Sequence, residues 1–163
     1  MFRRTPPGLR HDTEMHENEP AWKFEHSIEC DVSPEFAWSF WTTVSNWAFD
    51  ADVVSIELFG PFAAGSNGVT HSKSSGRVEW RIAAAEPGRA VIEFPFPGAV
   101  GRFVWTFRDS GGHARITQLC TIEGEAGLPL AQAFGPMLEA GIPAGMKKLC
   151  ENMERADRAR RGS

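Results

Sequence analysis

Six short runs of alternating apolar and polar residues lie between Val53 and Glu123, and a glycine-containing turn separates each run from the next. The separators read GPFAAGSN, SSG, EPG, PG and SGG, which is the composition of β-hairpin turns. Period-two alternation predicts half-buried strands, and short turns pair neighbouring strands antiparallel. The predicted strands span residues 53–59, 68–73, 77–86, 89–96, 99–109 and 113–123. An antiparallel sheet is therefore expected at the centre of the fold.

Another strand and a short aromatic helix are predicted before this sheet. The segment WKFEHSIECDV, residues 22–32, alternates almost throughout. Ser33 then offers an N-cap and Pro34 suits the first helical position. An apolar face follows at helical spacing: Phe36, Ala37, Phe40, Trp41, Val44 and Trp47. Trp38 falls off this face and is expected at an entrance or an exposed contact, and residues 46–52 are expected to form a turn or a second short helix.

The last third of the chain, from Leu128 to about Arg160, has the apolar period of a helix. Gly135-Pro136 and Gly141-Ile142-Pro143 are expected to kink or break it, because a proline removes a backbone donor and crowds the preceding turn. A bend is expected near Pro143. The apolar side chains expected to face the sheet are Phe134, Met137, Leu138, Ile142, Met146 and Leu149.

Length and charge narrow the class of protein. The 163 residues fit one domain, expected over residues 21–160 after a disordered tail over residues 1–20 that is rich in proline, histidine and acid. A net charge of -4 without a dense basic run argues against nucleic acid as a partner. No apolar run reaches the roughly 20 residues of a membrane span, and no signal peptide is visible, so a cytoplasmic location is expected.

The three cysteines, Cys30, Cys120 and Cys150, show no metal-binding spacing and are expected to be buried free thiols rather than a disulfide or a metal site. No metal and no cofactor is expected, because the sequence lacks the glycine-rich loops that bind dinucleotides or phosphates and the HExxH zinc motif. The oligomeric state is left open, with a homodimer as one option.

The phrase VSPEFAW at residues 32–38, the pair Asn46-Trp47 and the order of elements resemble the START-like superfamily, also called the SRPBCC or polyketide cyclase/dehydrase and lipid transport group. The resemblance covers about residues 22–158. It implies an α+β helix-grip fold, in which a curved seven-stranded antiparallel sheet wraps around a long C-terminal helix and two short helices close one end. It also implies a cavity between sheet and helix for an apolar ligand such as a lipid, sterol, polyketide or hormone.

Polar residues among apolar neighbours on the predicted strands are the candidates for contact with such a ligand: His26, His71 and Gln118. A buried imidazole or amide needs a hydrogen-bond partner, which could be the protein itself, a trapped water or the ligand. The apolar wall is expected to include Trp41, Trp80, Phe94, Trp105, Met137 and Met146. The first strand is expected to pair with the last, which would place Cys30 and Cys120 on the same inner face.

Two functions remain open at this point. The chain could bind and shield a small apolar molecule, or it could act as a cyclase or dehydratase on a polyketide-like or aromatic substrate, with His26 or His71 as general base and Gln118 as donor. The absence of tyrosine and of a clear acid–base pair favours binding. A cavity filled by bulky aromatic residues would instead indicate an interaction protein.

Overall fold

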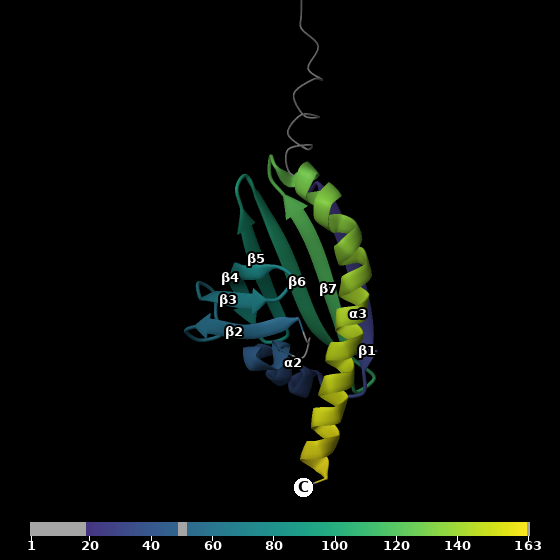
Figure 1. Ribbon diagram of the computed structural model, residues 1–163. Helices are drawn as coiled ribbons and strands as arrows, with labels where there is room; N and C mark the ends of the chain where they lie inside the picture. Colours follow the sequence, from purple (N-terminus) through teal and green to yellow (C-terminus); the bar gives the residue numbers. More distant parts are fainter. Residues whose placement is uncertain (1–18, 49–51, 163) are drawn as a thin grey trace, which may run out of the picture.

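The computed structural model describes residues 19–48 and 52–162 (Figure 1). The elements follow the predicted order: β1 (Trp22–Cys30), α2 (Pro34–Thr42), the 3-10 helix η1 (Val44–Trp47), β2 (Val53–Phe59), β3 (Asn67–Ser72), β4 (Gly76–Glu86), β5 (Arg89–Phe96), β6 (Ala99–Ser110), β7 (His113–Glu123) and α3 (Gly127–Arg161). The tail expected over residues 1–20 lies almost wholly outside the described residues. The domain expected from residue 21 onward begins with β1.

The seven strands form one antiparallel sheet in the order β1-β7-β6-β5-β4-β3-β2. The predicted pairing of the first and last strands is confirmed, with Phe24 opposite Cys120 and Cys30 opposite Ala114. Cys30 and Cys120 are both buried on the face that carries the core. Irregular registers in β2 and β4 accompany a strong twist, so that β2 and β3 lie across the direction of β6 and β7 in Figure 1. This is the helix-grip arrangement.

The aromatic helix α2 packs beneath one end of the sheet, beside η1 (Figure 1). Its predicted N-cap is confirmed, because the Ser33 hydroxyl accepts a hydrogen bond from the Phe36 amide at 3.1 Å. Trp41 is buried at the centre of a ring cluster, with its centroid 5.3 Å from that of Phe107. Trp38 lies 5.5 Å from Phe107, so its expected place at an entrance is wrong: the ring packs against the core from the side of α2.

Helix α3 is continuous for 35 residues through Pro136 and Pro143, so of the expected kink or break, the break does not occur. Figure 1 shows the helix bowed along the sheet. Its N-terminal half packs on β1, where Trp22 donates an indole hydrogen bond to Glu139 at 3.1 Å and a Cβ at Gly135 would lie 3.0 Å from the same indole. None of the described helices combines the length and the apolar composition of a membrane span.

A disulfide joins Cys30 at the end of β1 to Cys150 in α3, with Cα atoms 5.5 Å apart. The expectation of free thiols is therefore wrong for this pair. The bond could not be inferred from the sequence because the two residues are 120 positions apart and meet only through the fold. Cys120 is a buried free thiol, as expected, and burial raises its pKa to about 12.

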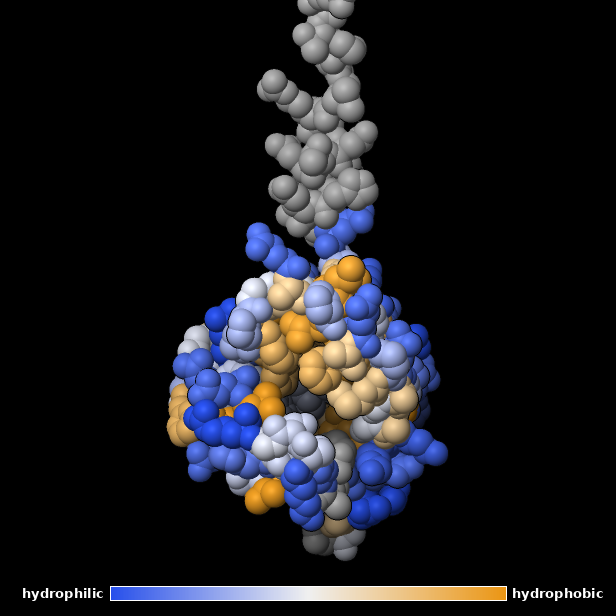
Figure 2. Space-filling view, turned by 45° about the horizontal axis from the view of Figure 1, so that its top comes forward, coloured by the Kyte–Doolittle hydropathy of each residue, from blue (hydrophilic) through white to orange (hydrophobic). Residues whose placement is uncertain are grey.

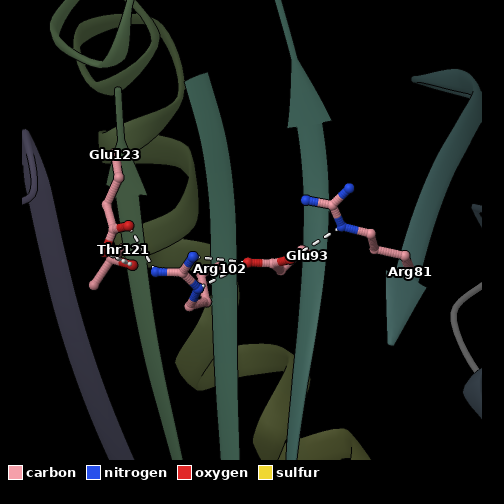
Figure 3. A network of polar contacts seen from close by, with 5 residues as sticks. All are labelled: Arg81, Glu93, Arg102, Thr121 and Glu123. Atoms are coloured by element: carbon pink, nitrogen blue, oxygen red, sulfur yellow. Dashed lines mark hydrogen bonds and ion pairs between the residues drawn. The ribbon is translucent and has the colours of Figure 1, made fainter. Parts of the chain in front are cut away.

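The convex face of the sheet carries a chain of charged groups across four strands (Figure 3). Glu93 of β5 accepts hydrogen bonds from Arg81 at 3.0 Å and from Arg102 at 2.9 Å, and Arg102 also pairs with Glu123 at 2.6 Å. Thr121 donates to Glu123 at 3.5 Å. The alternation of the strands thus places charge on this face and apolar side chains on the other.

Candidate ligand cavity

A cavity of about 420 Å³ lies between the concave face of the sheet and α3. Figure 2 shows the molecule hollowed between patches of hydrophobic residues. Strands β5, β6 and β7 form one wall, α3 forms the other, and α2 with η1 closes one end. The lining residues are Trp41, Trp47, Ile92, Phe94, Phe103, Trp105, Gln118, Met137, Leu138, Gly141, Ile142, Gly145, Met146 and Leu149. The volume falls within the range of about 300–1,000 Å³ that is usual for small-molecule pockets.

Two glycines of α3 explain why this space stays open. Gly141 and Gly145 are one turn apart, so both lie on the same side of the helix, and both line the cavity. A Cβ placed on either glycine would meet no atom within 4 Å. Any larger side chain at these positions would project into the cavity and reduce its volume.

Aromatic rings make up much of the wall. The rings of Trp41 and Trp105 lie 5.0 Å apart between centroids, and those of Phe94 and Phe103 lie 5.1 Å apart. Trp47 donates its indole hydrogen bond to the Trp41 carbonyl at 2.6 Å, which holds η1 against α2. These contacts hold the aromatic side chains of the wall against one another.

Apolar side chains also stand at the edge of the cavity. Met137 lines the cavity and is 60% exposed, so the space opens to the surface beside it. Phe134, one turn earlier in α3, stacks on Phe96 of β5 with ring centroids 6.5 Å apart, and both rings are 40% exposed. Phe96, Phe134 and Met137 thus form an exposed apolar edge on the surface, and Met137 connects this edge to the cavity lining.

Six of the residues predicted for the site line the cavity: Trp41, Phe94, Trp105, Gln118, Met137 and Met146. Trp80 does not. It is buried beside the cavity, where its indole donates to the Thr70 hydroxyl at 3.0 Å and its ring lies so close to Gly68 that a Cβ there would collide with it. Its role is in the packing of β3 against β4.

The structure separates the two predicted histidines from the cavity. His71 pairs with Arg77, on the face opposite to Trp80, so its expected place among the inner residues is wrong. The alternation with Val69 was misleading because Val69 is itself buried on the convex side, opposite Glu79. His26 lies on the concave face beside Gln118 but is absent from the cavity lining.

Sequence reasoning missed several lining residues, above all Trp47, Gly141 and Gly145. Trp47 had a signal, since it falls on the apolar face predicted for the aromatic helix. The glycines gave the opposite signal, because glycine and proline within a helical pattern predict a break rather than a cavity.

One cluster of potential metal ligands occurs among the described residues, formed by Cys30, Cys150 and Glu154. Because the two sulfur atoms are bonded to each other, no thiolate is free there to bind an ion. In the part of the chain that the structure describes, no cysteine, histidine or carboxylate lines the cavity. Its chemistry is that of an apolar container with one amide.

Comparison with known proteins agrees with this geometry. A family model described as "Polyketide cyclase / dehydrase and lipid transport" matches residues 21–156. No curated protein matches the chain.

Similar solved structures share the fold at low sequence identity. The Zhui aromatase/cyclase from Streptomyces sp. R1128 superposes with a TM-score of 0.70 at 12% identity, over 85% of this chain and 96% of that one. Norcoclaurine synthase from Thalictrum flavum, in complex with dopamine and hydroxybenzaldehyde, superposes with a TM-score of 0.66 at 9% identity, over 94% of this chain and 95% of that one. A protein from Thermus thermophilus superposes with a TM-score of 0.67 at 15% identity, over 83% of this chain and 99% of that one.

Proposed function

Because this chain belongs to the polyketide cyclase/dehydrase and lipid transport family, we propose that it binds a small apolar molecule in the cavity between α3 and the sheet. The observation that carries the proposal is a cavity of about 420 Å³ whose fourteen described lining residues are all apolar except Gln118. Transfer of apolar surface from water into such a site is favourable by about 25 cal/mol per Å². The ligand would thus be held mainly by burial of its own apolar surface.

A catalytic role is the alternative, supported by the family and by the fold shared with the Zhui aromatase/cyclase. Cyclisation needs a general base within reach of the reacting carbon. Within residues 19–48 and 52–162, the lining includes no titratable side chain, and neither His26 nor His71 belongs to it. The composition of the lining therefore favours binding over catalysis.

A side chain built into the cavity tests the proposal. Gly145→Leu should fill the space between α3 and the sheet without a clash at its Cβ, because no atom lies within 4 Å of that position. Leucine is also the better helix former by roughly 0.5–1 kcal/mol, so the fold should persist. We expect the neutral fluorescent probe N-phenyl-1-naphthylamine to bind the wild type and to bind Gly145→Leu at least about tenfold more weakly. Fluorescence titration measures the affinity, and circular dichroism checks the fold.

The matched control is Ala144→Leu, which adds a larger side chain at an exposed position of the same helix turn. It should bind the probe like the wild type. A wild type that binds no apolar probe would contradict the proposal, and equal binding by Gly145→Leu would place the ligand outside this cavity. Native mass spectrometry of protein purified from its host would then identify the natural ligand.

A further inference from the structure

One polar side chain stands in the apolar wall of the cavity. Gln118 lies in the middle of β7, opposite Trp105 of β6 on one side and His26 of β1 on the other. It is only 6% exposed and it lines the cavity. The alternation of β7 places it between Ile116 and Cys120, which are both buried in the core.

The Gln118 amide makes no side-chain hydrogen bond to any of the described residues. Other polar groups nearby are satisfied: the Trp47 indole bonds to the Trp41 carbonyl, and the Trp80 indole bonds to Thr70. No polar side-chain atom of the described residues is both sealed from solvent and unpaired, so the amide of Gln118 is reached from the cavity. An amide can accept at its oxygen and donate twice at its nitrogen. A bound molecule is therefore the partner that this geometry offers to it.

The described residues of the same wall carry no charge. None of those that line the cavity is an aspartate, glutamate, lysine, arginine or histidine. The ionised groups of the neighbouring strands, Arg81, Glu93 and Arg102, pair with one another on the convex face. A carboxylate or an ammonium group in the cavity would be desolvated with no opposite charge among the described lining residues to pair with, which is strongly unfavourable.

We propose that the cavity selects an uncharged molecule with an apolar body and one carbonyl or hydroxyl group, and that Gln118 binds that group. The inference rests on the proposed binding function. Gln118 then determines specificity, since a ligand that lacks the polar group leaves the amide without a partner once water is displaced. An ionised fatty acid or amine is rejected because none of the lining residues that the structure describes stabilises its charge.

Three naphthalenes of similar size form the test with the full chain. They are 2-acetylnaphthalene, which carries a carbonyl, 2-ethylnaphthalene, which carries no polar group, and 2-naphthoate, which is ionised at neutral pH. We expect the wild type to bind the ketone roughly three- to tenfold more tightly than the hydrocarbon, as one net hydrogen bond allows. The carboxylate should bind at least about a hundredfold more weakly than the ketone. Isothermal titration calorimetry measures all three.

The variant Gln118→Met keeps the length of the side chain and removes its hydrogen-bonding groups. This variant should bind the ketone more weakly and the hydrocarbon more tightly than the wild type does, so that the preference for the ketone is lost or reversed. Gln132→Met, the same substitution at an exposed position of α3, should leave the preference unchanged.

The possible outcomes distinguish a failure of this inference from a failure of the proposed binding function. If the wild type binds ketone and hydrocarbon equally, or binds the carboxylate as tightly as the ketone, the inference is overturned while binding in the cavity stands. The same holds if Gln118→Met keeps the full preference for the ketone. If the wild type binds none of the three molecules, nor N-phenyl-1-naphthylamine, both the inference and the proposed function fail. If Gln118→Met does not fold, the relative affinities of the wild type for the three naphthalenes still test the inference.

Discussion

At the scale of single residues, Glu93 marks a limit of sequence reasoning. Glu93 lies opposite Arg81 of β4 and Arg102 of β6, on the face away from the core, where charged side chains are usually solvated. The structure nevertheless buries it to 7% exposure, because the two arginine side chains cover it from the neighbouring strands (Figure 3). Burial by itself raises the pKa of Glu93, but the hydrogen bonds from Arg102 and Arg81 outweigh it and lower the pKa below its ordinary value.

Glu93→Gln should lower the free energy of unfolding by about 1–3 kcal/mol at neutral pH, since it removes the charge from two charge-assisted hydrogen bonds. The lowered pKa in the folded state means that the ionised carboxylate stabilises the fold above the ordinary carboxyl pKa. That stabilisation is lost as the pH falls through the lowered value. The difference between wild type and Glu93→Gln should therefore shrink in acid, as urea unfolding at several pH values would measure.

Glu79→Gln is the control for this experiment, because among the described residues Glu79 pairs with Arg77 alone, and both side chains are more than half exposed. It should change the free energy of unfolding by no more than about 0.5 kcal/mol. If the difference in free energy of unfolding between wild type and Glu93→Gln does not vary with pH, the charge of Glu93 does not stabilise the fold.

At the scale of elements, the strands were the most predictable part of the chain. β5 and β7 begin and end at the predicted residues, because alternation and hairpin turns are local signals. α3 was less predictable. Pro136 and Pro143 each remove one backbone donor, yet the helix stays continuous because it packs along β1 and β7. These packing contacts involve strands that are far from the helix in the sequence, so the sequence of the helix alone does not predict them.

The disulfide that anchors α3 to β1 should contribute measurably to stability. Removal of a native disulfide typically costs about 2–5 kcal/mol, because the unfolded chain regains the freedom of a long loop. Cys150→Ser, or the wild type with reductant, should therefore unfold at lower urea concentration than the oxidised protein. Unfolded, unreduced protein should react with a thiol reagent at Cys120 alone, and Cys120→Ser should not react at all. Reaction at all three cysteines without reductant would contradict the bond.

At the scale of the whole molecule, the order of elements and the phrase around Ser33 were enough to predict the helix-grip fold. The cavity was predicted less completely, because its volume depends on the absence of a side chain at Gly141 and Gly145. His71 shows a second reason why the cavity lining was hard to predict. Alternation tells which residues share a face, but the apolar Val69 on the convex side made that face look like the core. Only the register with β4 decides which face is which.

The three indole rings in the cavity wall should make the intrinsic fluorescence of the protein sensitive to ligand binding. The chain has six tryptophans and no tyrosine, so its ultraviolet-excited emission comes from indole alone, and Trp41, Trp47 and Trp105 line the cavity. An uncharged aromatic molecule that enters should shift or quench this emission without any added dye. Trp105→Phe should reduce the response, while Trp22→Phe, outside the lining, should retain it. An unchanged spectrum on saturation with a molecule that calorimetry shows to bind would mean that the molecule sits away from these rings.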